Sequence, residues 1–410
     1  MQTNLTEKIL STESGQRADH ILRKCVHCGF CTATCPTYQL LNDELDGPRG
    51  RIYLVKNMLE GGSVDRETQL HLDRCLTCRS CETTCPSGVN YAELIDIGRL
   101  HAERQNLRPW HEKMLRWLLG EILPWHNRNR WIFKLGSQLR FILPAVLKQK
   151  TPNIRAISFQ AKNTIGDKGK VLLLQGCVQS TISPNTNAAA EQMLVHLGYE
   201  VLIEKENHCC GALNHHLNQT QAAENWMKSN LDNWQKYDNS YGIDAIVSTA
   251  SGCGIMLKDY EKLLPLQNRS DQTRQLLNKI CDISELLDIK VLQDQNFVTS
   301  KQNIAFHAPC TLQHGHKLGE HLFNQLSQLG YNIHQPEDAH LCCGSAGTYS
   351  LLQPEISRQL QQNKMKALNQ LEPDVIITAN VGCEHHLQAV SDNAVVHWVE
   401  LISSDLKKNQ

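Results

Sequence analysis

The sequence predicts a multi-domain protein of mixed α and α/β class, with an N-terminal α-helical domain followed by two duplicated α/β lobes. Near the N-terminus, two cysteine runs of identical spacing are separated by stretches of helical periodicity. In the C-terminal half, short continuous apolar runs alternate with helical stretches, as in parallel sheets covered on both faces. That half also repeats itself after 130 to 133 residues, which indicates two related lobes.

Length and composition limit the class of protein. The 410 residues are enough for several cores, and we expect domains at 1–100, 170–300 and 301–410, joined by a helical region at 101–169. A net charge of −1 creates no general attraction to nucleic acid. No apolar stretch is long enough to predict a transmembrane helix, and the polar N-terminus predicts no signal peptide, so we expect a cytoplasmic protein. Seventeen cysteines in such a chain favour metal binding over disulfides.

The two N-terminal runs are CVHCGFCTATCP at 25–36 and CLTCRSCETTCP at 75–86. Both have the spacing C-x2-C-x2-C-x3-C-P, which is the bacterial ligand run for [4Fe–4S] clusters. The fourth cysteine of such a run usually ligates the cluster of the other run. We therefore predict one cluster on Cys25, Cys28, Cys31 and Cys85, and a second on Cys75, Cys78, Cys81 and Cys35.

Zinc and disulfides are the alternatives for these runs. A structural zinc needs only four ligands, usually as two close pairs, whereas each run already offers four. Disulfides suit small secreted domains. The long interval between Cys35 and Cys75 has helical periodicity, which favours a mainly helical two-cluster domain. Within it, Arg49 and Arg51 either donate hydrogen bonds near a cluster, raising its potential, or begin a solvent-exposed helix.

Residues 101–150 differ from the rest, with ten Lys and Arg against three Glu and four of the seven tryptophans. Two segments, HEKMLRWLLGEIL and WIFKLGSQLRFIL, have amphipathic periodicity. Basic helices that carry tryptophan can lie on an anionic membrane or dock a partner subunit. Packing on the chain's own core is the alternative. Residues 151–169 are predicted to be a linker.

Eight cysteines in the C-terminal half form two matching sets. Each set has a cysteine after an apolar run, a double cysteine 32 residues later and a final cysteine after a second apolar run. The sets are Cys177, Cys209, Cys210 and Cys253, then Cys310, Cys342, Cys343 and Cys383. Ligands of open α/β sheets gather beyond the carboxyl ends of the strands, so each set is predicted to meet at one sheet edge. Cys281 lies outside the repeat and is predicted to be a buried apolar thiol.

These cysteines resemble the cysteine-rich CCG domain, which occurs twice in heterodisulfide reductase and related iron–sulfur subunits. Together with the two ferredoxin-type runs and the stretch ELDGPRGRIYLVKNML, they make nearly the whole chain similar to the iron–sulfur subunits of bacterial glycolate oxidase. Subunits of anaerobic glycerol-3-phosphate dehydrogenase and lactate-utilisation proteins share this plan. The fold class implied is a helical two-cluster ferredoxin domain followed by two α/β CCG lobes.

The sequence departs from the full CCG pattern, which ends in C-x2-C, because Ala250 and Asn380 replace the first of those two cysteines. The remaining four thiols of each lobe could hold a further cluster or be a structural remnant. Histidines beside them are candidate ligands or hydrogen-bond donors: His208, His307, His314, His316, His340 and His385.

No GxGxxG motif or nucleophile elbow is present, so we expect no FAD or NAD site and no substrate-oxidising residue in this chain. The resemblance implies that a separate FAD subunit oxidises glycolate to glyoxylate and that this chain passes the electrons to a quinone or another acceptor. Contact with the inner membrane would then be peripheral. The alternatives are a subunit of a lactate or glycerol-3-phosphate dehydrogenase, a disulfide or quinone reductase acting at a lobe cluster, and an assembly scaffold.

Overall fold

The computed structural model describes residues 1–138, 158–159, 166–206, 209–264, 270–295 and 297–408. The chain divides into two compact units. The first comprises residues 1–117, 313–315 and 340–364, and the second comprises residues 118–312, 316–339 and 365–410. The predicted linker at 151–169 lies mostly outside the described residues, as does the end of the second predicted amphipathic helix.

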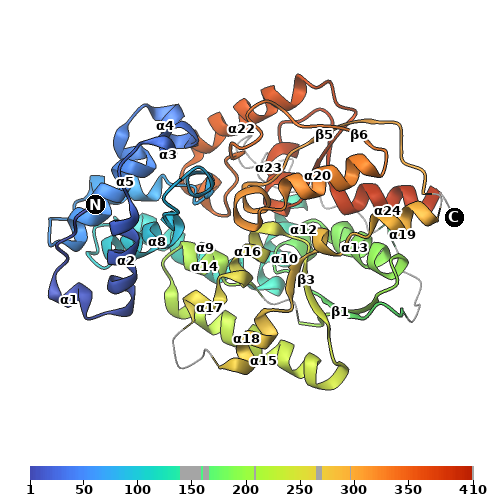
Figure 1. Ribbon diagram of the computed structural model, residues 1–410, viewed down its shortest axis with the longest axis horizontal. Helices are drawn as coiled ribbons and strands as arrows, with labels where there is room; N and C mark the ends of the chain where they lie inside the picture. Colours follow the sequence, from blue (N-terminus) through green and yellow to red (C-terminus); the bar gives the residue numbers. More distant parts are fainter. Residues whose placement is uncertain (139–157, 160–165, 207–208, 265–269, 296, 409–410) are drawn as a thin grey trace. The chain divides into compact units, whose positions relative to one another are not determined.

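The N-terminal part of the first unit is helical, as predicted, and is drawn in blue in Figure 1. Residues at the helix starts are those that favour them. Thr12 Oγ1 accepts a hydrogen bond from Gly15 N at 3.0 Å, and Pro48 occupies the first turn of a helix, where a backbone N–H would have no partner within the helix. A core that includes Leu22, Val55 and Leu94 joins these helices. The elements are α1 (Glu7–Leu10), α2 (Glu13–Lys24), α3 (Phe30–Ala33), α4 (Pro36–Leu41), η1 (Glu44–Asp46), α5 (Pro48–Leu59), α6 (Arg66–Asp73), α7 (Ser80–Thr83) and α8 (Tyr91–Glu103).

The second unit contains two four-stranded parallel sheets of the same strand order, β2-β1-β3-β4 and β6-β5-β7-β8. The predicted duplication of α/β lobes is therefore confirmed. Continuous apolar runs form the central strands, because these are covered on both faces. The strands are β1 (Lys170–Leu173), β2 (Glu200–Ile203), β3 (Ala245–Ser248), β4 (Ile280–Asp282), β5 (Asn303–Phe306), β6 (Asn332–His334), β7 (Val375–Thr378) and β8 (Ala394–His397).

Helices connect the strands of each lobe. Those of the first lobe are α12 (Gln179–Ile182), α13 (Pro184–His196), α14 (Ala212–His216), α15 (Thr220–Tyr241), α16 (Ser251–Lys258), α17 (Tyr260–Leu263), α18 (Asp271–Leu277), η3 (Ile283–Leu286) and α19 (Ile289–Asp294). Those of the second repeat are the π-helical η4 (Thr311–His316), α20 (Gly319–Gln328), α21 (Tyr349–Leu352), α22 (Pro354–Asn369), α23 (Val381–Gln388) and α24 (Trp398–Lys408).

The sheets of the two lobes share one hydrophobic core within the second unit. Val171 and Val247 of the first sheet belong to the same buried cluster as Phe306 and Ile377 of the second. Helices α13 and α24 also meet, since Ser403 Oγ donates to Ala189 O at 2.7 Å. The lobes of this unit are therefore expected to unfold together.

Two further helices, α9 (Trp110–Ile122) and α10 (His126–Gln138), follow the helical N-terminal part. Their apolar side chains are largely exposed: Trp110, Trp117 and Trp131 expose 73%, 58% and 74% of their surface. Among the described residues, no helix is both long enough and apolar enough to cross a membrane.

A truncation in the shared core tests whether the lobes are coupled. Replacing the fully buried Phe306 with alanine should lower the free energy of unfolding by about 3–5 kcal/mol, because a cavity remains where the ring was. Denaturant unfolding can be followed through the buried Trp234 of the first lobe and Trp398 of the second. The unfolding midpoint reported by each tryptophan should shift equally. The control Val298→Ala, at a side chain 65% exposed, should change little. A shift confined to one lobe would contradict the shared core.

Candidate metal centres

The four cysteines predicted to bind the first cluster line one cavity. Cys25, Cys28, Cys31 and Cys85, called here the first thiol set, line a volume of about 450 Å³ that includes space open to solvent, and Cys81 also lines it. Burial, together with the neighbouring Cys25, Cys85 and Cys28, raises the pKa of Cys31 to about 11. Four thiols this close favour a bound cation, which would remove their mutual repulsion and deprotonate them.

The second thiol set, Cys35, Cys75, Cys78 and Cys81, is also brought together. Burial raises the pKa of Cys81 well above its ordinary value, and Cys78, Cys75 and Cys35 raise it further. Cys35, Cys75 and Cys81 are buried, whereas Cys28 of the first set is exposed. Each set thus combines three thiols of one run with the fourth of the other. Both donor sets fit a [4Fe–4S] cluster, whose usual ligands are four thiolates.

The same backbone conformation positions the cysteines of both runs. In the first run His27 and Gly29 adopt φ of +56° and +85°, and in the second Thr77 and Arg79 adopt +53° and +62°. A left-handed conformation is unfavourable by roughly 1–2 kcal/mol for a residue with a Cβ atom. That three such residues adopt it indicates that the loop geometry is required to direct the thiols inward.

Buried cations surround the second thiol set. Arg51, only 1% exposed, donates to Thr37 Oγ1 at 3.1 Å, and that hydroxyl lies 3.3 Å from Cys35 Sγ. Burial alone lowers the pKa of Arg51, but Tyr91, Cys75, Cys35 and Asp46 raise it above its ordinary value. A positive charge held here would stabilise the more negative, reduced state of a cluster. Arg51 therefore lies beside a thiol set and not at a solvent-exposed helix start.

Two more side chains support the same set. Arg99 donates from Nη2 to the carbonyl oxygens of Leu72 and Cys75, and Tyr91 Oη donates to Cys75 Sγ at 3.8 Å. Arg49, in contrast, is 39% exposed, forms an ion pair with Glu44 at 2.6 Å and lines the cavity of the first set. No motif or spacing in the sequence pointed to Thr37, Tyr91 or Arg99.

The four repeat cysteines of the first lobe form a third group within the second unit. The thiol of Cys209 is hydrogen-bonded to Cys177 and Cys210, and that of Cys210 to Cys253. Hydrogen bonds from Cys209 and Cys253 lower the pKa of Cys210 well below its ordinary value. These four residues, the lobe-1 thiol set, meet beyond the ends of β1 and β3, where the sequence predicted them. His208 lies outside the described residues.

Polar contacts hold the loops that carry the lobe-1 thiol set. Asn129 Nδ2 donates to Cys177 O at 3.0 Å, and Asn230 Nδ2 donates to Cys209 O at 2.9 Å. Gly211 has φ of +83°, and its N–H lies 3.3 Å from Cys209 Sγ. The double cysteine is therefore followed by a tight turn that requires glycine.

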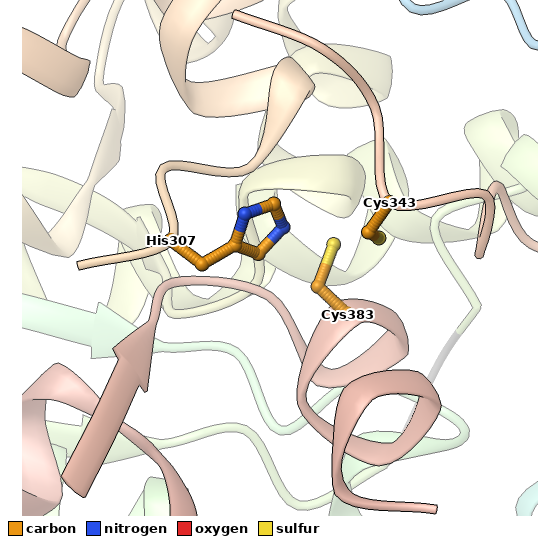
Figure 2. A group of neighbouring side chains, drawn as sticks. All are labelled: His307, Cys343 and Cys383. Carbon is orange, nitrogen blue, oxygen red and sulfur yellow. The ribbon is translucent and has the colours of Figure 1, made fainter. Parts of the chain in front are cut away.

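The repeat cysteines of the second lobe are divided between the units. Cys310 and Cys383 belong to the second unit, whereas Cys342 and Cys343 lie on the 340–364 segment of the first. Figure 2 shows the His307 ring directed toward Cys383 Sγ, and ligand atoms of these two residues lie within 4.8 Å. Asn380, which replaces a cysteine of the full pattern, donates from Nδ2 to Cys383 Sγ at 3.7 Å.

Three of the candidate histidines form hydrogen bonds with protein groups. His314 lies 3.0 Å from Thr83 Oγ1 and 2.9 Å from the carbonyl oxygen of His340. His316 Nε2 donates to Ser251 O at 3.1 Å, and His385 Nε2 lies 2.8 Å from Ser183 Oγ. Each of the three rings thus has a hydrogen-bonding partner in the protein.

Comparison with known families matches the two parts of the chain separately. The model of the 4Fe-4S dicluster domain matches residues 21–89. The model of the CCG cysteine-rich domain matches twice, at residues 171–258 and 304–388.

Two curated relatives match all or nearly all of the chain. It is 46% identical over 409 residues to the glycolate oxidase iron-sulfur subunit of Escherichia coli (strain K12), covering 100% of both chains. It is 29% identical over 417 residues to the probable glycolate oxidase iron-sulfur subunit of Bacillus subtilis (strain 168), covering 93% and 92%. A shorter relative is the lactate utilization protein A of Bacillus subtilis (strain 168), 24% identical over 217 residues and covering 52% of this chain and 88% of its own length.

Removing the buried arginine tests its effect on the second thiol set. Arg51→Met should shift the midpoint potential of the bound cluster to a more negative value, because the reduced state loses a nearby cation. It should also lower the free energy of unfolding by about 3–5 kcal/mol, because Asp46 loses a buried ionic partner. A redox titration followed by paramagnetic resonance measures the first effect. The control Arg23→Met, at a side chain 59% exposed, should leave both quantities unchanged.

Proposed function

Because the chain belongs to the family of glycolate oxidase iron–sulfur subunits, as its full-length 46% identity shows, we propose that it is an electron relay. A separate flavin subunit oxidises glycolate to glyoxylate and takes up two electrons as a hydride. This chain passes them on one at a time through two [4Fe–4S] clusters to a quinone or another acceptor. Substrate oxidation takes place on the flavin subunit.

The observation that carries the proposal is the crosswise grouping of the cysteines. The first thiol set takes Cys85 from the second run, and the second takes Cys35 from the first. Each run supplies one ligand to the cluster of the other run. The two clusters must therefore lie close together, as electron transfer between them requires. When bound, the clusters supply the one-electron steps. The residues of this chain ligate them, and Arg51 offsets the charge of the second.

The substrate class rests on similarity alone. Because the chain is also similar, over about half its length, to a lactate utilization protein, a lactate or glycerol-3-phosphate dehydrogenase subunit is the alternative. The relay would be the same in each case, since the hydride acceptor lies on another chain.

The lobe-1 thiol set supports a further cluster in this chain. Four thiols meet there within one lobe, and cysteine thiolates are the usual ligands of iron–sulfur clusters. Such a centre would extend the relay beyond the ferredoxin domain. A reductase acting on a disulfide or quinone at this centre is the second candidate function, and the buried thiols are the observation that favours it.

The exposed tryptophans of α9 and α10 support a peripheral contact with an anionic membrane, where a quinone acceptor would be found. Trp131 is 74% exposed, and Arg128 packs over the Trp125 ring at 5.0 Å. Tryptophan and basic side chains on one amphipathic helix are typical of proteins that lie on the membrane interface.

Loss of one ligand of the first thiol set tests the relay. Cys28→Ala in the native complex should leave reduction of the flavin by glycolate intact. Electron transfer to a quinone analogue should fall by at least about tenfold, since changes outside the ligand shell already cost 10–100-fold. Lactate and glycerol 3-phosphate, tested in parallel, should give slower flavin reduction than glycolate. Undiminished transfer in this variant, with the complex still assembled, would contradict the relay.

Iron counting tests the further cluster. An anaerobically prepared chain should contain about twelve iron atoms with three [4Fe–4S] clusters and about eight with two. Cys210→Ala should reduce the higher value to the lower one and leave the paramagnetic signals of the ferredoxin clusters unchanged. The control Cys281→Ala, outside all three thiol sets, should not alter the iron content. A wild-type count of about eight would contradict the further cluster but not the relay.

A further inference from the structure

The two cluster loops share a backbone conformation but differ in exposure. In the first loop, Val26 and Phe30 expose 66% and 60% of their surface. Fifty positions later, in the second loop, Leu76 and Ser80 expose only 7% and 1%. The apolar side chains of the first loop thus lie in solvent, whereas the equivalent positions of the second are covered.

The second loop is covered by segments of its own unit that come from the second repeat. His314 lies 3.0 Å from Thr83 Oγ1, between the last two cysteines of the run. Tyr349 Oη donates to Arg74 O at 2.9 Å, immediately before the first cysteine of the run. Residues of the second repeat therefore contact both ends of the second run. A partner protein cannot approach the run where these residues cover it.

The first thiol set is more accessible to solvent than the second. Val26 and Phe30 line its cavity, which is continuous with solvent, and Cys28 between them is exposed. Exposed apolar groups grouped around a functional site are typical of a protein contact, and aromatic residues are enriched at the cores of interfaces. Electron-transfer contacts are among the smallest protein interfaces.

Positive groups border the patch. The N-terminal ammonium group donates to Cys25 O at 2.6 Å. Arg49 also lines the cavity, where it is ion-paired with Glu44 at 2.6 Å. The ammonium group would attract a carboxylate at the edge of an apolar partner surface, and such complementarity increases the rate of encounter.

We propose that Val26, Phe30 and the exposed edge of the first thiol set form the docking surface for the electron-donating flavin subunit. Electrons then enter at the first cluster and pass inward to the second. This assignment rests on the relay function proposed above and adds its direction and its contact surface.

Variants of the loop test the docking surface in the full-length, cluster-loaded chain. Val26→Ser and Phe30→Ser leave every ligand in place. The flavin subunit is reduced photochemically beforehand, so the result does not depend on the identity of the substrate. Stopped-flow measurement of cluster reduction against flavin-subunit concentration should show the half-saturating concentration rising about tenfold for Phe30→Ser, as for a central aromatic contact.

Several controls separate docking from damage to the cluster. Reduction by dithionite and the paramagnetic signals of both clusters should match those of the wild type. Val298→Ser, at a side chain 65% exposed in the second unit, should leave the half-saturating concentration unchanged. An unchanged value for both loop variants, an equal rise for Val298→Ser, or a loop variant that changes only self-association of this chain would each overturn the proposal. If glycolate fails to reduce the flavin subunit while docking behaves as expected, only the substrate assignment is wrong.

Discussion

The buried carboxylate of Asp46 is the interaction on which the first unit depends. It lies 3.3 Å from Arg51, 3.1 Å from His71 Nδ1 and 2.8 Å from Arg74, and it is fully buried. Its carbonyl oxygen accepts a hydrogen bond from Thr37, two residues after Cys35. One residue thus joins the end of the first cysteine run to the start of the second. A buried charge that lost these partners would be strongly destabilising, so the relative position of the two thiol sets is fixed by electrostatics as well as by packing.

The two lobes share one strand order but differ in how their cysteines are grouped. Their strand orders are identical, and both place cysteines beyond the central strands. In the first lobe the four thiols form one hydrogen-bonded group. In the second, the 340–364 segment is part of the first unit, where Tyr349 Oη donates to Arg74 O at 2.9 Å. The duplicated loop has thus become part of the surroundings of a ferredoxin centre.

The sequence predicted those features that depend on local spacing. Cysteines two residues apart on a tight turn converge whatever surrounds them, and continuous runs such as VLLL form strands covered on both faces. Contacts between residues far apart in the chain left no such signal. Nothing near Tyr349 or His314 indicates that they reach residues 74 and 83, and the pairing of Asp46 with Arg74 spans 28 residues. Candidate histidine ligands were equally ambiguous, because a buried ring can satisfy its N–H with a backbone carbonyl.

The unequal exposure of the two ferredoxin loops has a consequence for the stability of the clusters toward oxygen. Dioxygen and superoxide reach an iron cube from solvent. Cys28 of the first set is exposed, whereas three of the four thiols of the second set are buried. Oxidative loss of iron should then begin at the outer cage. The docked flavoprotein would act as its shield, so that the complex survives aeration better than the separated chain.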